Sequence, residues 1–354
     1  MAYTTIDDGS AYFQTLLWTG DDNNDRALTN TGNSNLQPDW VWIKNRSGGA
    51  KSHQLVDSSR GVTKYLFSEA TTVESTLTNR LDSFDTDGFT TDNHSSVNES
   101  SRTYVAWQWK ANGGTTSSNS DGDITSTVQA NTTAGFSIVT YTGNGNDGDT
   151  VGHGLSGNWD LCILKNRGQT DYWTVSRTGN NQVLLLHDNV NEANHSTAYM
   201  TKGSGVIGLV SAGDLGMVNG SSETYVAYVF KAIQGYSRFG SYTGNGNADG
   251  PFVYTGFKPA WLMIKATGST GGASAWRIAD NKRSSSGGGN PVEKQLEADT
   301  NNTEDSGNDV DLLSNGFKVR STAAQWNASG VEIIYMAFAE HPFVSSEGVP
   351  TTAR

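Results

Sequence analysis

Three acidic, asparagine-rich loops are the segments of this sequence best suited to hold a ligand. They read DDNND at residues 21–25, NGNDGD at residues 144–149 and NGNADG at residues 245–250. Calcium takes about six to eight hard oxygen ligands, which carboxylate and amide groups provide. No loop matches the twelve-residue calcium loop with its final Glu, so a solvated hairpin tip is the alternative. The candidate ligand residues are Asp21, Asp22, Asp25, Asp147, Asp149 and Asp249.

Aromatic side chains beside Asn or Asp are a second candidate for ligand contact. A ring can stack on a sugar while polar groups bond to the sugar hydroxyls. The chain has 10 Trp and 13 Tyr, and most of them recur at strand positions, so we expect Trp107, Trp109 and Trp261 to pack in the core. Trp326, followed by Asn327 in the polar segment 321–330, is the better candidate for an exposed, ligand-binding ring.

The sequence shows no catalytic constellation, and we expect that the protein is not an enzyme. Its six histidines have neither the HExxH spacing nor the Cys-His clustering of a zinc site. A GxSxG elbow, a Walker loop and a dinucleotide fingerprint are all missing from the sequence. The single cysteine, Cys162, lies in an apolar strand candidate, so we expect a small buried hydrophobe.

A pattern of roughly the length of a small domain is written three times along the chain. Its copies end in TYVAWQWKA (103–111), TYVAYVFKA (224–232) and IYMAFAE (334–340), which aligns Tyr104, Tyr225 and Tyr335. Other anchors recur in the same order. They are a Thr-Gly opening, an apolar run closed by a lysine (Lys44, Lys165, Lys265), and a later step at Gly88-Phe89, Gly216-Met217 and Gly316-Phe317.

Short β-branched and aromatic stretches between Gly, Asn, Asp and Ser predict an all-β fold without long helices. Asn-Gly turns and about seven strands per repeat favour three tandem β-sandwich domains, jelly-roll or lectin-like. The predicted division is a 1–10 N-terminal extension, 11–111 repeat 1, a 112–135 polar linker, 136–232 repeat 2, 236–340 repeat 3 and a 341–354 C-terminal tail. The long linker indicates that repeat 1 is placed more independently than the other two.

The closing strands have two apolar faces. In repeat 1, Val105, Trp107 and Trp109 alternate with Tyr104 and Ala106. We expect the aromatic face to be the core face. The Tyr-x-Ala face then belongs either to a covered central strand or to a contact with a neighbouring domain.

The net charge of -12 and the pI near 4.9 disfavour binding to nucleic acid or to anionic membranes. No apolar stretch has membrane-spanning length, and the first residues show no basic-then-apolar signal peptide. A durable β-protein made without export fits a virus particle, assembled in the cytoplasm of the host.

The string of anchors resembles a repeated domain of virion structural proteins from marine and cyanobacterial tailed bacteriophages. The resemblance runs from about Phe13 to Arg354 and is clearest in YMAFAEHPFVSSEGVPTTAR (335–354). It implies a virion protein, usually a tail or fibre component, that contacts other virion proteins. It carries over no catalytic residue. Repeat 2 departs most from the pattern, with Leu161 where the others have Trp40 and Trp261.

Three functions follow as hypotheses. The first is a tail fibre or other exposed appendage that binds host cell-surface polysaccharide, and a homo-oligomer is expected by association with other fibres. The alternative is a capsid decoration or tail adaptor protein with a purely structural role. A weaker alternative is a polysaccharide-degrading tailspike, which would require a carboxylate pair in a cleft.

Overall fold

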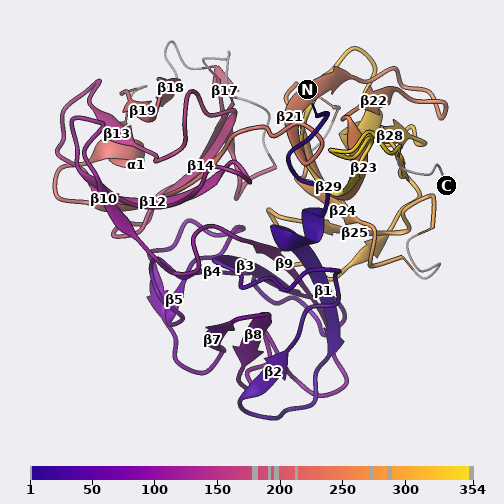
Figure 1. Cartoon of the computed structure of the whole chain (residues 1–354), viewed down its shortest axis with the longest axis horizontal. Helices are drawn as coiled ribbons and strands as arrows, with labels where there is room; N and C mark the ends of the chain where they lie inside the picture. Colours follow the sequence, from indigo (N-terminus) through magenta and orange to yellow (C-terminus); the bar gives the residue numbers. More distant parts are fainter. Residues whose placement is uncertain are drawn as a thin grey trace.

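The computed structural model describes residues 2–177, 182–189, 193–194, 199–211, 214–268, 270–271, 274–284 and 289–350. In this part the chain is all-β, as predicted, and its strands form several separate sheets. The helical segments described are one 3-10 turn, η1 (Gly9–Ala11), and two single-turn helices, α1 (Gly216–Asn219) and α2 (Ala324–Asn327). Three lobes surround a common centre (Figure 1).

Unit 1, residues 13–109, contains a four-stranded main sheet in the order β1-β9-β3-β4. A small sheet, β2-β8-β7, and the pair β5-β6 complete it. Its strands are β1 (Phe13–Thr19), β2 (Arg26–Leu28), β3 (Trp40–Asn45), β4 (Gln54–Asp57), β5 (Lys64–Tyr65), β6 (Ser75–Thr76), β7 (Leu81–Asp85), β8 (Gly88–Thr91) and β9 (Thr103–Trp109).

Unit 2, residues 117–230, has an eight-stranded main sheet, β10-β11-β12-β20-β14-β15-β16-β17, and a small sheet, β13-β19-β18. Its first strands are β10 (Ser117–Asn119), β11 (Ser126–Asn131), β12 (Phe136–Thr142), β13 (Thr150–Gly152), β14 (Leu161–Asn166) and β15 (Trp173–Arg177). The others are β16 (Gln182–Leu185), β17 (Ala193–Asn194), β18 (Met200–Lys202), β19 (Val206–Leu209) and β20 (Thr224–Phe230). The predicted polar linker, 112–135, contains β10 and β11, which extend the main sheet of unit 2.

Unit 3, residues 237–342, has a six-stranded main sheet, β21-β29-β23-β24-β25-β26, and a small sheet, β22-β28-β27. Its strands are β21 (Ser237–Thr243), β22 (Phe252–Tyr254), β23 (Phe257–Ala266), β24 (Arg277–Asp280), β25 (Lys294–Glu297), β26 (Asp305–Ser306), β27 (Val310–Leu313), β28 (Gly316–Val319) and β29 (Glu332–Pro342). Strand β29 therefore continues two residues into the predicted C-terminal tail.

The three units share one central pattern. In each, the closing strand (β9, β20 or β29) lies between the opening strand and the strand that ends near the lysine. The strand register aligns Trp40, Leu161 and Trp261, which lie opposite Trp109, Phe230 and Phe338. The order of these anchors in the sequence thus reports a real structural repeat.

Two predicted anchors are wrong. Tyr104 pairs with Trp18 and Tyr225 with Tyr141, but Ile333, not Tyr335, pairs with Tyr242 in the equivalent place. The third tyrosine is therefore displaced by two residues, which an alternating strand pattern tolerates without changing face. Likewise, Ile207 of β19 is the counterpart of Phe89 and Phe317, whereas Gly216-Met217 opens α1.

Both faces of the closing strands are buried, in separate cores in units 1 and 2 and in one continuous core in unit 3. The Tyr-x-Ala face packs inside its own unit, where Tyr104 and Ala106 join Leu28 and Phe89 of the small sheet. Unit 2 repeats this arrangement with Tyr225 and its neighbours. The predicted core face, which carries Trp107 and Trp109 in unit 1, instead points to the centre of the molecule, where Trp261 of β23 is also buried as expected.

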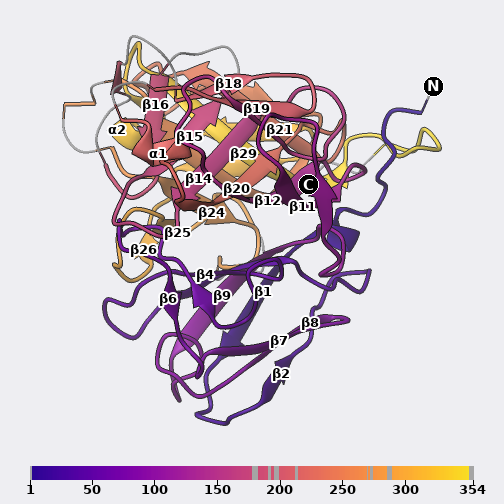
Figure 2. The ribbon, with the colours of Figure 1, turned by 90° about the vertical axis from the view of Figure 1, so that its left-hand side faces the viewer.

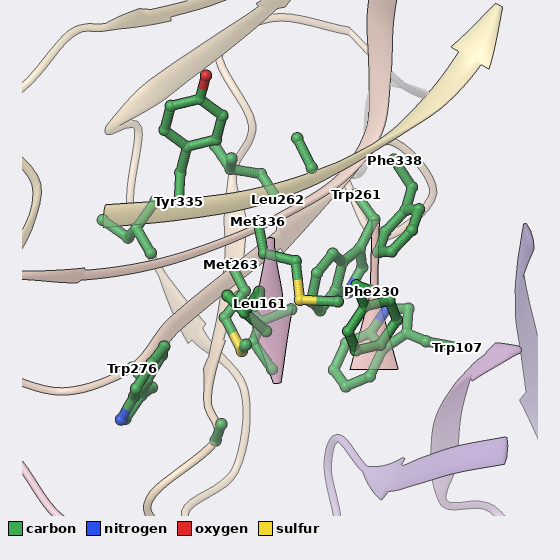
Figure 3. Packing of buried hydrophobic residues seen from close by; sticks show 14 of the residues in the cluster. Trp107, Leu161, Phe230, Trp261, Leu262, Met263, Trp276, Tyr335, Met336 and Phe338 are labelled. Carbon is green, nitrogen blue, oxygen red and sulfur yellow. The ribbon is translucent and has the colours of Figure 1, made fainter. Parts of the chain in front are cut away.

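The centre is one aromatic cluster to which all three units contribute. Figure 3 shows Trp107 of unit 1, Phe230 of unit 2, and Trp261 and Phe338 of unit 3 packed together. The ring of Trp40 stacks on Tyr228 with centroids 4.2 Å apart, and Trp109 meets Trp261 edge-on at 5.6 Å. Burying large rings from three units removes much apolar surface from water, so the units stabilise each other.

The units also close a ring through one repeated contact. One position on the next strand lies opposite the anchor lysine in every unit. It holds His53 in unit 1, Trp173 in unit 2 and Trp276 in unit 3. Each donates a ring N–H to a backbone carbonyl of the preceding unit, and unit 1 donates to unit 3. These bonds are Trp173 Nε1 to Phe67 O (2.9 Å), Trp276 Nε1 to Leu185 O (2.8 Å) and His53 Nε2 to Glu297 O (2.9 Å). The prediction that the first repeat is independently placed is therefore wrong.

His53 can donate a ring N–H, as Trp173 and Trp276 do in the other units, because its tautomer is fixed. Trp42 Nε1 donates to His53 Nδ1 at 2.8 Å, so Nδ1 accepts and Nε2 carries the proton. Burial, together with the nearby charge of Lys44, holds the pKa of His53 well below its usual value. The ring thus remains neutral and keeps its N–H directed at unit 3.

Two fully buried arginine clusters reinforce the seams between units. Asp57 accepts from Arg60 Nε at 2.5 Å and from the hydroxyl of Tyr228 of unit 2 at 2.8 Å. In the equivalent place of unit 3, Asp280 accepts from Arg283 Nε (2.6 Å) and from Trp107 Nε1 of unit 1 (3.0 Å). Tyr228 and Trp107 thus have the same role, because each fixes a neighbour's carboxylate.

Candidate functional site

The predicted acidic loops are held by a repeated asparagine just before the closing strand. Its side-chain amide donates to two oxygen atoms of the loop, one on a side chain and one on the backbone. These bonds are Asn98 to Asp21 and Asn23 (both 2.9 Å), Asn219 to Asn144 (3.0 Å) and Asn146 (2.8 Å), and Asn327 to Asn245 (3.1 Å) and Asn247 (2.7 Å). Asn327, predicted as a ligand-binding residue, is fully buried and shapes the loop instead.

Sequence reasoning missed this clamp, although its signal is present. The strings VNESS (97–101), VNGSS (218–222) and WNASG (326–330) stand before the three closing strands. Three residues after each asparagine comes a left-handed residue, namely Ser101, Ser222 or Gly330. The asparagine is thus a further anchor of the repeat, separate from the Gly-Phe step.

The candidate aspartates serve the loops in different ways. The following bonds and ion pairs occupy their oxygens: Asp21 with Asn23 N (3.0 Å) and Arg26 (3.4 Å), Asp22 with Ser100 N (2.9 Å), Asp147 with Ser211 N (2.6 Å), Asp149 with Asn144 and Asn146 (2.6 and 3.1 Å), and Asp249 with Lys318 (2.6 Å). Asp25 is exposed with a left-handed backbone.

The structure does not gather these carboxylates into a cation site. Within the described ranges, no group of three or more His, Cys, Asp or Glu side chains is placed to hold a metal ion. A hydrogen bond from Lys318, together with its positive charge, lowers the pKa of Asp249. Calcium binding at these loops stays a prediction.

The prediction of an exposed ring at Trp326 is wrong. Only 1% of this side chain is exposed, and its Nε1 donates to Gln295 Oε1 at 2.9 Å. Its backbone carbonyl accepts from the hydroxyl of Tyr242 at 2.8 Å. The polar setting of the segment reflects the asparagine clamp that follows, so Trp326 is the apolar residue that anchors α2 in the core.

Exposed aromatic rings do occur together, on an edge strand of unit 3. Phe252 and Tyr254 are 47% and 46% exposed, and they alternate with the buried Val253 on β22. Two residues apart on a strand, both rings lie on the same face. Among the described strands, β22 pairs only with β28. This edge therefore presents two neighbouring rings to solvent.

A groove begins beside these rings. It holds about 460 Å³ and is lined by Tyr3, Gln234, Arg238, Phe239, Tyr254 and Gly256, among others. The hydroxyl of Tyr3 lies 3.1 Å from that of Tyr254 and donates to Gly256 O at 2.8 Å. We call this surface, together with Phe252, the β22 groove. Aromatic faces next to amide and guanidinium donors are the groups that bind sugars and other polyols.

Three buried lysines occupy equivalent places in the three units. Lys44, Lys165 and Lys265 are all fully buried, and burial lowers the pKa of each to about 8. Their ammonium groups donate to backbone carbonyls. Lys44 reaches Asn301 O of unit 3 at 2.9 Å, and Lys265 reaches Asp188 O of unit 2 at 3.1 Å. Lys44 and Lys265 thus join neighbouring units, whereas Lys165 donates to Asn166 O and Gln169 O of its own unit.

Cys162 is fully buried, as predicted, and burial raises the pKa of its thiol. The thiolate, which is the reactive form, is therefore disfavoured. Among the described residues, no helix has the length and apolar character needed to cross a membrane.

Comparison with known proteins gives one result. The sequence profile described as "Domain of unknown function (DUF7483)" matches residues 8–342, which include all three units. The chain belongs to this family. No curated protein and no solved structure matches it.

Proposed function

We propose that this chain is a structural protein of a tailed-bacteriophage virion, exposed on a tail fibre or another appendage, where it binds host-surface glycans. The observation that carries the proposal is the β22 groove, with two exposed rings on one face of an edge strand beside Tyr3 and Arg238. The acidity of the chain and the resemblance of its anchors to virion proteins support the same reading.

The ring of units changes how such a protein would work. A tandem array would extend toward the host, whereas three units around one core form a compact binding head (Figures 1 and 2). We infer that each unit is a β-sandwich, with its main and small sheets as the two layers. The apolar Tyr-x-Ala face, which motivated the adaptor hypothesis, is covered within its own unit, so it gives that hypothesis no further support.

The test is equilibrium binding of the full-length protein to surface polysaccharide extracted from host cells. Saturable binding is expected. Tyr254→Ala and Phe252→Ala should each weaken it roughly two- to tenfold, since a ring contact contributes about 0.5–1.5 kcal/mol. Tyr254→Phe keeps the ring and should bind nearly as well as the wild type.

Tyr172→Ala is the matched control, because this ring is 44% exposed but lies in unit 2, outside the groove. Equal losses from Tyr172→Ala and Tyr254→Ala would remove the groove from the proposal. A folded protein that shows no saturable polysaccharide binding, but associates with purified virion proteins, would favour the adaptor or decoration role. Light scattering of the same sample tests the predicted homo-oligomer.

A further inference from the structure

The β22 groove carries one positive charge and no negative one. Among the described residues that line it, Arg238 is the only charged side chain, and it is exposed to solvent. The chain as a whole has 36 Asp and Glu against 24 Lys and Arg. Carboxylates line the pockets at two seams, Asp8 and Glu340 between units 1 and 3 and Asp160 between units 2 and 3. The groove is thus a locally positive site on an acidic protein.

The guanidinium of Arg238 has no counter-ion in the described chain. Two arginines are exposed there, and the other, Arg320, pairs with Asp311 at 3.4 Å, whereas Arg238 forms no ion pair. Every less exposed arginine that the structure describes is ion-paired as well, except Arg80, which lies over the ring of Tyr65. An anionic ligand in the groove would therefore meet a cation that has no partner to give up.

Unit 3 departs from the repeat where its opening strand lines the groove. The register with the closing strand makes Arg238 the counterpart of Gln14 in unit 1 and Ser137 in unit 2. Both of those side chains are uncharged and buried. The residue before Arg238 is Ser237, whereas a buried phenylalanine stands there in each of the other units. The exposed cation beside a short side chain is therefore particular to this groove and is not required by the common fold.

The neighbouring groups suit the uncharged part of a sugar. The exposed rings of Phe252 and Tyr254 can stack on its C–H faces. Gln234 is exposed as well, and its side-chain amide can both donate to hydroxyl groups and accept from them. Hydroxyl groups alone, however, do not use the charge of Arg238. A guanidinium binds a carboxylate or a phosphate best, through two parallel hydrogen bonds.

We propose that the β22 groove selects an anionic glycan, with Arg238 paired to a carboxylate or phosphate group of the sugar that stacks on Tyr254. This inference rests on the proposed function, because it names the class of glycan for the same groove. It also explains how an acidic protein binds an anionic polymer, since the contact is made where the local charge is positive.

Isothermal titration calorimetry of the full-length protein with matched sugars tests the requirement for charge. One pair is oligomers of galacturonic acid and of galactose, and the other is phosphomannan and its dephosphorylated form. At least one anionic sugar should bind saturably, about three- to tenfold more tightly than its neutral counterpart, because an exposed ion pair contributes modestly and its two hydrogen bonds add to it. The pair that shows the difference identifies the anion as carboxylate or phosphate.

Arg238→Met removes the charge and keeps most of the length of the side chain. It should lower the affinity for the anionic sugar to that for the neutral one and leave the neutral affinity unchanged, which a misfolded protein would not do. Arg320→Met is the matched control, because it removes the same charge from an exposed position outside the groove. Both affinities should then remain close to those of the wild type.

Equal affinity for the anionic and neutral members of both pairs, lowered by Tyr254→Ala, would overturn the anionic class while glycan binding in the groove stands. Equal losses from Arg238→Met and Arg320→Met would overturn it too, because the attraction would then come from the surface as a whole. Absence of saturable binding to all four sugars would also overturn it, and the proposed function would then depend on the extracted host polysaccharide alone.

Discussion

Replacing Tyr228 with Phe removes one hydroxyl that joins unit 2 to unit 1. That hydroxyl donates to Asp57 Oδ2 at 2.8 Å, and the carboxylate is fully buried. Asp57 keeps Arg60 as its ion-pair partner, so the substitution weakens the cluster without leaving an isolated charge. The ring of Phe can still stack on Trp40.

The expected loss follows from the charge on the acceptor. A hydrogen bond to a charged group contributes about 1.5–3 kcal/mol. Unfolding entropy is about 2.1 cal/mol/K per residue near 60 °C. For 354 residues unfolding together, that entropy is about 0.74 kcal/mol/K, so Tm should fall by about 2–4 °C. If unit 2 unfolded alone, the same loss would lower its Tm about three times as much.

Thermal unfolding followed by circular dichroism measures this shift. Tyr172→Phe is the control, because Tyr172 is 44% exposed and its hydroxyl is outside the seam clusters, and its Tm should match the wild type. A Tyr228→Phe protein with an unchanged Tm would show that the contact with Asp57 adds nothing to the seam. A much larger shift would contradict unfolding as one body.

Three further outcomes are expected. The pKa of Lys265 is about 8 in the folded protein and 10.5 in its ordinary state. Because the unfolded chain therefore binds more protons between these values, the free energy of unfolding should rise from pH 8 toward pH 10. If urea titrations gave a Lys265→Met protein the same rise of unfolding free energy with pH as the wild type, this reasoning would be contradicted. Gly88 and Gly61 both have φ +97°, but only at Gly88 would a Cβ lie 2.0 Å from Leu28 O. Gly88→Ala should therefore lower the free energy of unfolding far more than Gly61→Ala. Equal losses of unfolding free energy, measured by chemical denaturation, would refute this steric argument. Asn219→Ala should speed hydrogen exchange in residues 143–149 and cost about 1–3 kcal/mol; unchanged exchange would show that the clamp does not hold the loop.

The sequence was sufficient to predict the fold class, the threefold repetition and the burial of the large strand aromatics. Strand alternation shows which residues share a face, so Trp107 and Trp109 were grouped correctly. The lysine anchors were aligned correctly as well, because Lys44, Lys165 and Lys265 occupy equivalent register positions. Local pattern and composition carry this information.

What the sequence could not give lies in contacts between distant segments. Alternation cannot distinguish the interior of one repeat from a centre shared by three, so the role of Trp107 at the seam was hidden. A polar sequence context placed Trp326 at the surface, although the polarity belongs to the clamp of Asn327. Trp107 and Asp280, which are joined by a hydrogen bond across the seam between units 1 and 3, are 173 residues apart in the sequence. No local pattern links them.

The proposed compact head of three units depends on the units folding as one body. Differential scanning calorimetry of the full-length protein tests that dependence most directly. One shared aromatic core predicts a single transition in which the calorimetric enthalpy equals the van't Hoff enthalpy. Two or three resolved transitions, or a calorimetric enthalpy several times the van't Hoff value, would show independent units and contradict the closed ring.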